Sequence, residues 1–400
     1  MSLNFGREQL SIPGPSVMPD RVLAAMHRPS PNIYEGELID LTASLFPDLK
    51  TVAQTKHFAT IYISNGHGAW EAAISNTCSK GDTILVLVTG RFGQGWADMA
   101  TQLGVKTKIL DFGDSADADP AAVTKALEDD TDHTIKAVFT VQTDTASSVQ
   151  NDIPALRGAI DAANHPALFF VDCIASLGCD RFEMDAWGVD VMVTGCQKGL
   201  MTPAGMSFVF FNDKADVAYQ NADLKTPYWD WHPRANPEAY YQHFCGTAPT
   251  HHLYGLREAL NILVLEEGIE AAWARHQTMS RAVWAAVETW GCLELNIKDP
   301  AKRSQAVTTV LSKNDECGKL RHWCEHQAGL TLGIGLGLAV QGEKSWNNVM
   351  RIGHMGHLNP VMLMGALGTI DAGLKAMKIP HGSGALDAAS AEIAKHFTES

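Results

Sequence analysis

The chain lacks features that would mark it as a nucleic-acid-binding, membrane or secreted protein. Its 400 residues contain no basic cluster, and 31 Lys and Arg against 45 Asp and Glu give a net charge of −14. Such a charge disfavours nucleic acid as a partner. The longest apolar run, "LTLGIGLGLAV" at 330–340, is too short to span a bilayer, and no basic segment followed by an apolar one opens the chain. We therefore expect neither membrane association nor secretion.

Cysteine is sparse, and no two of the eight form a C-x-x-C pair. Neither a disulfide framework nor a metal site is predicted, and a reduced, cytoplasmic protein fits best. A cysteine-dependent lyase such as a desulfurase would need a reactive thiol on a loop. Cys317 and Cys324 instead lie on a predicted helix with nothing to activate them, which disfavours that class.

What the chain does contain, from residue 58 to 211, is a repeating alternation of two patterns. Short apolar, β-branched runs are each followed by helical periodicity, which predicts a largely parallel sheet covered on both faces. The runs are 58–64, 83–88, 135–141, 167–171, 189–194 and 206–211, and the helices between them are predicted at 69–79, 92–103, 119–130 and 152–164.

Beyond residue 211 the alternation ends. Residues 225–250, rich in Trp, Tyr, His and Pro, predict an irregular but ordered segment. Further helices are predicted from His252 onward and over 269–289, 315–328 and 360–377. The small, polar tail after Pro380 is expected to be loosely held.

The length exceeds what one small core organises, so more than one folding unit is expected. We expect an N-terminal arm at 1–20, a large domain at 21–265 and a smaller domain at 266–400.

Residues that directly follow the predicted strands are the main candidates for ligand binding, because ligands of open α/β sheets bind outside the carboxyl ends of the strands. The glycine loop "NGHGAWEAA" opens a helix and suits a phosphate, although an ordinary tight turn would look the same. Phe92, in "TGRFGQGW", could offer a flat face to a ring or simply be a core aromatic. The polar stretch "QTDTAS" could equally be a solvated loop.

Two further strand ends carry charge. Asp172 abuts five apolar residues, which is costly for a carboxylate unless a cation meets it, although it could also cap the next helix. Lys198 stands between glycines in "TGCQKGLMTPAG", where it could be a reactive amine or a lysine extending to the surface. Together, a phosphate cradle, an aromatic ring, a buried acid and a lysine match the needs of pyridoxal phosphate.

The same motifs resemble those of the class V pyridoxal-phosphate aminotransferases, specifically the alanine–glyoxylate and serine–glyoxylate branch. The matching segments are "SNGHGAWEAA" (64–73), "VDCIASLG" (171–178), "TGCQKGLMTPAG" (194–205), 12–26, 247–260 and 348–356. The resemblance implies fold type I, with a mostly parallel seven-stranded sheet in a large domain and a smaller α+β domain. It also implies pyridoxal 5′-phosphate as cofactor, small amino acids and 2-oxo acids as substrates, and a homodimer with shared active sites.

The resemblance implies a role for each matching residue. Lys198 would bind the cofactor covalently and move a proton between the substrate Cα and the cofactor. Asp172 would pair with the pyridine nitrogen and Phe92 would stack on the ring. The other cofactor contacts implied are Gly66, His67, Gly68, Thr145, Ile174 and Gln197, with Thr247 reaching the phosphate of the neighbouring subunit. Arg351 would bind the substrate α-carboxylate, with Gly14 and Tyr34 nearby.

The chain departs from this pattern in several places. The relatives' "SGTG" or "SGSG" is "SNGHG" here, a frequent tyrosine is Phe244, and "PNIYEGEL" (31–38) replaces a His-Arg-like pair that borders the substrate.

The predicted reaction transfers the amino group of L-aspartate to glyoxylate, because the chain resembles the bacterial aspartate–glyoxylate aminotransferases most closely. Serine–glyoxylate or alanine–glyoxylate transamination is the alternative. Aspartate needs an extra cation for its side chain, and the candidates are Arg91, Arg28, Arg234 and the His251–His252 pair.

Two rival classes fit the chain less well. In a nicotinamide-dependent oxidoreductase, "GIGLGLA" (333–339) would have to bind the dinucleotide, but its glycine spacing is wrong. A non-catalytic binding module would not need Lys198 and Asp172 together.

Overall fold

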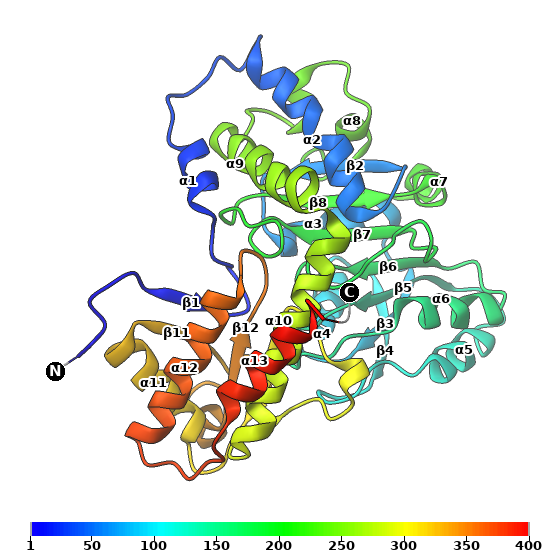
Figure 1. Cartoon of the computed structure of the whole chain (residues 1–400). Helices are drawn as coiled ribbons and strands as arrows, with labels where there is room; N and C mark the ends of the chain where they lie inside the picture. The colour runs from blue at the N-terminus through cyan, green and yellow to red at the C-terminus, as the bar shows by residue number, and fades with distance from the viewer. Residues whose placement is uncertain (1, 399–400) are drawn as a thin grey trace.

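The computed structural model describes residues 2–398 as two β-sheets with helices packed around them (Figure 1). The larger sheet has seven strands in the order β2-β8-β7-β6-β5-β3-β4, and only β8 runs antiparallel to its neighbours. The strands are β2 (Phe58–Tyr62), β3 (Thr83–Val88), β4 (Lys106–Asp111), β5 (Ile135–Val141), β6 (Leu168–Asp172), β7 (Val191–Gly195) and β8 (Ser207–Phe211). The mostly parallel seven-stranded sheet is thus confirmed.

A strand can be predicted from the sequence when it is buried, because burial requires a continuous run of apolar residues. Strands β6, β7 and β8 are buried along their whole length, so they appear as continuous apolar runs. The edge strand β4 was not anticipated, because its sequence "KTKILD" is mostly exposed and carries Lys106 and Lys108. Lysines on an edge strand also hinder pairing with another chain.

Two layers of helices sandwich this sheet. Helices α3 (Gly66–Thr77), α4 (Arg91–Gln102) and α7 (Asp213–Asn221) cover one face, where Trp70 and Trp96 join the core. Helices α2 (Glu37–Ala53), α5 (Pro120–Glu128), α6 (Ile153–Ala162) and α9 (Thr250–Leu260) cover the other face. The short helices α1 (Asp20–Met26) and α8 (His232–Ala235), the 3₁₀ turn Tyr240–His243 and the π-helical segment Asn261–Glu267 complete this part.

The second sheet has five strands in the order β1-β11-β12-β10-β9. Its strands are β1 (Gln9–Ser11), β9 (Glu294–Leu295), β10 (Val307–Leu311), β11 (Leu330–Ile334) and β12 (Val349–Gly353). Helices α10 (Ile269–Trp290), α11 (Glu316–Ala328), α12 (Pro360–Ala376) and α13 (Ala385–Lys395) pack with it, and 3₁₀ turns lie at Pro300–Lys302 and Lys344–Asn348. Strand β1 brings the N-terminal residues into this sheet, beside β11.

The expectation of a loosely held tail was wrong. Residues Ala385–Lys395 form α13, which lies along α10 (Figure 1). Ala385 and Ala389 are fully buried there, because alanines one helical turn apart let the two helices approach closely.

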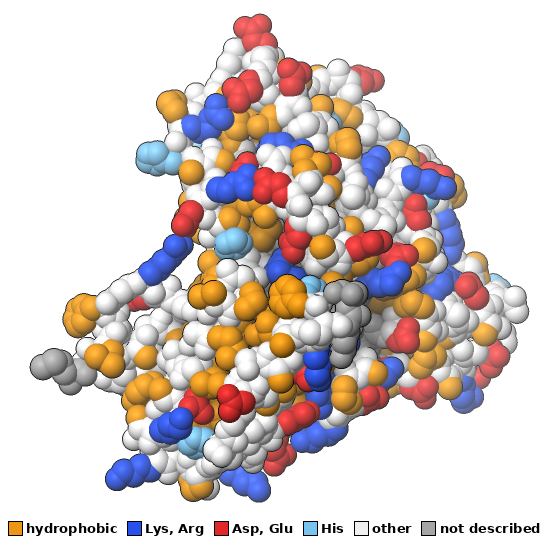
Figure 2. All heavy atoms as spheres, viewed as in Figure 1, with side chains coloured by type: hydrophobic (Ala, Val, Ile, Leu, Met, Phe, Trp, Pro, Cys, Tyr) orange, Lys and Arg blue, Asp and Glu red, His pale blue; other side chains and the backbone are white. Residues whose placement is uncertain are grey.

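The surface carries charges of both signs. On the face shown in Figure 2, Lys and Arg side chains lie among Asp and Glu side chains. Among residues 2–398, every helix is either too short or too polar to cross a bilayer.

The packing of β12 against the N-terminal segment generates a stability prediction. A Cβ on Gly353 would overlap the backbone carbonyl of Ile12, which cannot move away as a flexible side chain could. We expect Gly353→Ala to destabilise the protein by roughly 1–3 kcal/mol, seen as a lower thermal midpoint. Gly158→Ala is the control, since Gly158 lies in α6 with nothing within 4 Å of its added Cβ, and should gain about 0.5–1 kcal/mol. Equal midpoints for the two variants would contradict this packing.

Candidate active site

A cavity of 250 Å³ opens at the carboxyl ends of β5, β6 and β7. Val141 ends β5, Asp172 ends β6, and Lys198 follows β7 by three residues. The cavity is lined by Asn65, Gly66, His67, Trp70, Phe92, Val141, Thr143, Thr145, Asp172, Ile174, Ala175, Gln197 and Lys198. Most of the residues expected to bind the cofactor are therefore together at one edge of the sheet.

Asp172 provides a buried carboxylate in the wall of this cavity. Its side chain accepts hydrogen bonds from the Trp70 indole Nε1 at 2.7 Å and from the Ile174 backbone N at 2.6 Å. Burial raises the pKa of Asp172 to about 7, although both N–H groups oppose this rise and so does the nearby Lys198 charge. A cation placed against this carboxylate would keep it ionised.

Lys198 lies across the cavity under the N-terminal segment. Its Nζ donates a hydrogen bond to the Pro13 carbonyl, while Ser16 Oγ donates to the Lys198 carbonyl at 2.7 Å. Burial, with a smaller contribution from the Arg351 charge, lowers the pKa of Lys198 to about 8. Gly14 packs directly against the lysine side chain, where a Cβ would overlap it, and its φ of +95° also favours glycine.

The N-terminus of α3 forms another part of the wall. Asn65 caps this helix by accepting hydrogen bonds from the backbone N–H groups of His67 at 3.1 Å and Gly68 at 3.4 Å. A Cβ on Gly66 would overlap Ile174 Cδ1, so glycine is needed for the helix to approach the β6 loop. The positive end of the helix dipole at this N-terminus suits an anionic group.

Phe92 is held in the cavity wall by Asp144. The buried Asp144 carboxylate accepts hydrogen bonds from the backbone N–H groups of Phe92 at 2.7 Å and Gly93 at 3.3 Å, at the start of α4. A Cβ on Gly90 would lie only 2.5 Å from Asp144 Cγ. Asp144 thus fixes the backbone of Phe92, from which the ring extends into the cavity wall.

Arg351, on β12 of the second sheet, contacts Thr145 in the wall of the cavity but does not itself line the cavity. Its Nε donates to the Ile334 carbonyl at 2.6 Å and its Nη1 donates to the Thr145 carbonyl at 2.9 Å. Its side chain is buried, and burial lowers its pKa to about 10, so it stays charged at neutral pH. Within residues 2–398 its Nη2 has no hydrogen-bond partner, which leaves the end of the guanidinium available to a carboxylate.

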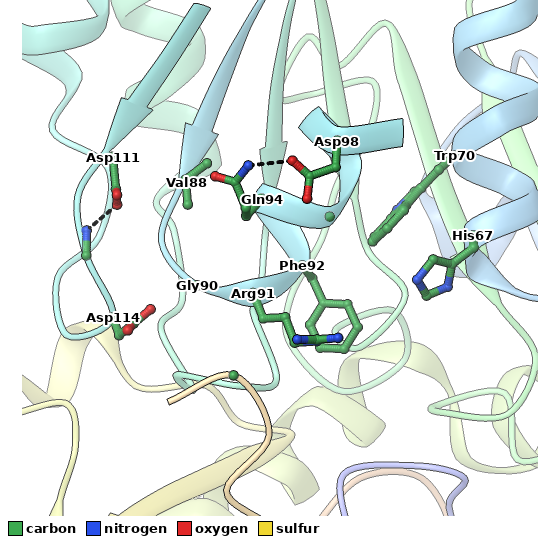
Figure 3. Close-up of a pocket in the computed structure, with 13 residues that line it drawn as sticks. His67, Trp70, Val88, Gly90, Arg91, Phe92, Gln94, Asp98, Asp111 and Asp114 are labelled. Carbon is green, nitrogen blue, oxygen red and sulfur yellow. Dashed lines mark hydrogen bonds between the residues drawn. The ribbon is translucent and has the colours of Figure 1, made fainter. Parts of the chain in front are cut away.

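A second, open hollow of 420 Å³ adjoins the cavity and shares His67, Trp70 and Phe92 with it. Figure 3 shows Arg91 and Phe92 pointing to the same side, toward His67, while Asp111 and Asp114 lie at the other end. Arg91 is exposed, and its guanidinium has no carboxylate partner among residues 2–398.

Some expected residues lie elsewhere in this protomer. Tyr34 is 85% exposed, Thr247 is exposed, and neither lines the cavity. Gly68 lies in the first turn of α3, where a Cβ would face Ser64 and Trp229, and it does not line the cavity; its contact with the cofactor stays a prediction.

Most of the cations proposed for a donor side chain are engaged elsewhere. Arg234 is fully buried and donates to the carbonyls of Ile61, His243 and Tyr228, so it is a core residue. The Arg28 guanidinium stacks 3.6 Å from the Tyr254 ring centre. His251 and His252 contact the backbone of Arg28 and Ala204. Of these candidates, Arg91 is the one that adjoins the site.

Six residues of the site were given no role from the sequence. They are Asn65, Trp70, Val141, Thr143, Asp144 and Ala175. Trp70 could have been found, because it lies four residues after Gly66 on the same helix face. Thr143 and Asp144 lie in the polar stretch "QTDTAS" after β5, but no local pattern shows that Asp144 binds the amides at the start of α4.

The residues present fit a phosphorylated, heteroaromatic cofactor. The buried Asp172 carboxylate suits a ring N–H, Phe92 offers a flat face, and Lys198 supplies an amine. Gln197 Oε1 is buried without a hydrogen-bond partner within residues 2–398, which marks a place where a bound polar group is expected.

Comparisons with known proteins agree with this chemistry. Residues 47–360 match the family model "Aminotransferase class-V". The chain is 38% identical over 396 residues to a serine–glyoxylate aminotransferase of Methylorubrum extorquens, with 96% of each chain covered. It is 32% identical over 391 residues to an L-aspartate–glyoxylate aminotransferase of Paracoccus denitrificans, covering 97% of this chain and 96% of the relative. The fold matches a pyridoxamine–pyruvate aminotransferase of Mesorhizobium loti with a TM-score of 0.88 at 24% identity, covering 98% of this chain and 99% of the other.

The lowered pKa of Lys198 predicts unusual amine reactivity. In cofactor-free protein labelled competitively with acetic anhydride, the reactivity of Lys198 should rise with pH around a midpoint near 8, because only the neutral amine reacts. A free lysine derivative in the same tube should titrate at about 10.4. Mass spectrometry of the Lys198 peptide measures both, and a midpoint shared with the free derivative would contradict the burial of this amine.

Proposed function

The chain belongs to the class V aminotransferases, and we propose that it transfers the amino group of L-aspartate to glyoxylate, giving oxaloacetate and glycine. It is a pyridoxal-phosphate-dependent transferase, and the bound cofactor supplies an electron sink for the carbanion formed at the substrate Cα. The observation that supports the proposed site is that Lys198 and Asp172 line the same cavity.

Several residues would orient the cofactor. Asp172 would accept a hydrogen bond from the pyridine nitrogen, and Phe92 would cover one face of the ring. The phosphate would bind at the N-terminus of α3, where the helix dipole favours an anion and the amides of His67 and Gly68 already donate to Asn65. Gln197 would contribute its side-chain amide, whose Oε1 is buried without a hydrogen-bond partner within residues 2–398.

Lys198 would carry the proton between the substrate Cα and the cofactor. A pKa of about 8 suits this task, because the amine can both take up and release a proton near neutral pH. Arg351 would bind the α-carboxylate through the end of its guanidinium, since its Nε and one Nη1 hydrogen are already held by backbone carbonyls.

The proposed assembly is a cytoplasmic homodimer. Thr247 and Tyr34 are exposed in the protomer, which is consistent with roles at the site of a neighbouring copy. Thr247 would then contact the phosphate of that neighbouring site.

Arg91 supports L-aspartate as donor. A donor with a second carboxylate needs a second cation, and the Arg91 guanidinium, which has no carboxylate partner within residues 2–398, lies beside Phe92 in the hollow that adjoins the cavity (Figure 3). Of the acidic residues of the same hollow, Asp111 and Asp114 lie at its far end, and Asp98 accepts a hydrogen bond from Gln94 Nε2 at 2.7 Å, so none of them pairs with Arg91 within residues 2–398.

L-Serine is the second candidate donor. The 38% identity to a serine–glyoxylate aminotransferase exceeds the 32% identity to the aspartate–glyoxylate enzyme. Serine needs no cation beyond Arg351. A panel of amino donors with glyoxylate as acceptor tests both, and a clear preference for serine would overturn the aspartate proposal.

Replacing Arg91 separates the two donors. Arg91→Ala should lower kcat/KM for L-aspartate by roughly tenfold or more while changing that for L-serine little, because only aspartate presents a second carboxylate. Arg281→Ala, which removes an exposed arginine of α10, is the matched control and should leave both unchanged. Equal losses for both donors would exclude Arg91 as the residue that selects aspartate.

Replacing Arg351 should affect every donor. Arg351→Ala is expected to raise KM by roughly tenfold or more for L-aspartate and for L-serine alike, because both share the α-carboxylate. Arg351→Lys should recover part of the loss, since a single ammonium cannot reproduce the two-pronged contact. An unchanged KM in Arg351→Ala would place the α-carboxylate elsewhere.

A further inference from the structure

We propose that Trp70 is a positioning residue for Asp172, whose carboxylate it orients through the indole N–H so that a free lone pair faces the pyridine nitrogen of the cofactor. This inference rests on the proposed role of Asp172. It adds a residue from α3 to a contact otherwise made at the end of β6.

The hydrogen bond itself is short and shielded. Trp70 Nε1 donates to Asp172 Oδ2 at 2.7 Å, and both side chains are at most 2% exposed. The other oxygen, Oδ1, accepts from the Ile174 backbone N–H at 2.6 Å. Each carboxylate oxygen is thus fixed by one donor, which sets the plane of the carboxylate and leaves one lone pair on each oxygen.

Trp70 cannot easily turn away from this position. Its ring stacks on Trp96 with centroids 5.8 Å apart and an interplanar angle of 16°, and His67 packs on it at 4.5 Å. A Cβ on Gly95 would come within 3.4 Å of the same ring, so α4 also lies close. The indole is therefore locked by packing on more than one side, as a residue that orients another must be.

One helix connects the two ends of the proposed cofactor site. Gly66 and His67 start α3 at the phosphate end, and Trp70 follows one turn later at the ring-nitrogen end. Because a helix turn has a fixed length, the spacing between the phosphate cradle and the Asp172 carboxylate is set within α3.

The charged and polar groups around Asp172 determine the pKa of its carboxyl group. Lys198 across the cavity favours the ionised carboxylate, whereas Asp144 beyond β5 and burial disfavour it. The Cys173 thiol next to it has its pKa raised well above the ordinary value, so it brings no charge. Since the Trp70 N–H favours the ionised form, its removal would raise the pKa of Asp172 beyond about 7.

The test compares Trp70→Phe with Trp231→Phe in the full-length protein. Trp231 is equally buried and stacks on Phe211 rather than on Trp70, and its Nε1 makes no hydrogen bond within residues 2–398, so its replacement controls for lost packing. Pyridoxal 5′-phosphate is titrated into cofactor-free protein and followed by visible absorbance. Trp70→Phe should weaken cofactor affinity by roughly tenfold or more, whereas Trp231→Phe should change it little.

The pH dependence distinguishes orientation of the carboxylate from general loosening. As pH falls, Asp172 becomes protonated and affinity drops; in Trp70→Phe this drop should begin at a higher pH than in the unmodified protein or in Trp231→Phe. Unchanged affinity and an unchanged pH profile in Trp70→Phe would overturn the inference, as would equal effects of the two substitutions.

Asp172→Asn separates this inference from the proposed site. Asp172→Asn should weaken affinity strongly, and adding Trp70→Phe to it should cost less than in the unmodified protein, because the bond to a charged acceptor is already gone. If Asp172→Asn binds the cofactor normally, the proposed role of Asp172 fails. If only Trp70→Phe binds normally, the role of Asp172 stands and that of Trp70 is overturned.

Discussion

A carboxylate buried at the end of a β-strand is the constraint on which the rest of this site depends. Asp172 is only 2% exposed, and desolvation of its charged form must be offset by what surrounds it. The fold provides the offset in two ways. Strands β6 and β7 run parallel, with Asp172 paired to Val193, so the turn that carries Lys198 emerges beside the carboxylate. Helix α3 adds the indole N–H of Trp70 from the face above the sheet.

The second sheet acts on the same cavity through a few specific hydrogen bonds. Arg351 of β12 donates to the Thr145 carbonyl, and the buried Asp180 accepts from Thr143 Oγ1 at 2.9 Å and from the Gln305 backbone N at 2.6 Å. Strand β1 pairs with β11 and leads directly to Pro13, whose carbonyl accepts from Lys198. The segment that covers the lysine is therefore anchored in one sheet while the lysine belongs to the other.

The sequence predicted those parts of the molecule that depend on neighbouring residues in the chain. The six buried strands and the helices capped by Asp119 and Asp152 were indicated, since apolar runs and N-cap residues are local signals. Lys198 and Asp172 were indicated as candidates because strand ends gather at one sheet edge, and the two line the same cavity. Strand β4 was missed because an exposed edge strand lacks an apolar run. The packing of α13 depends on α10, about a hundred residues earlier in the chain, which no local pattern reports.

Cofactor binding and donor choice also differ in whether they depend on local segments or on contacts between distant parts of the chain. The proposed cofactor contacts lie on strand ends and on the first turn of α3, which the core of the large sheet holds rigidly. The rim of the site, where Arg91 begins α4, is built differently. A Cβ on Gly337, in the loop after β11, would lie 2.8 Å from the Cβ of Arg91. Two separate parts of the chain thus meet at the place where a donor side chain would lie. Loops tolerate change more readily than buried strands do. On the proposed assignment, donor choice would depend on rim residues such as Arg91, whereas the buried pair of Asp172 and Lys198 would serve any amino donor.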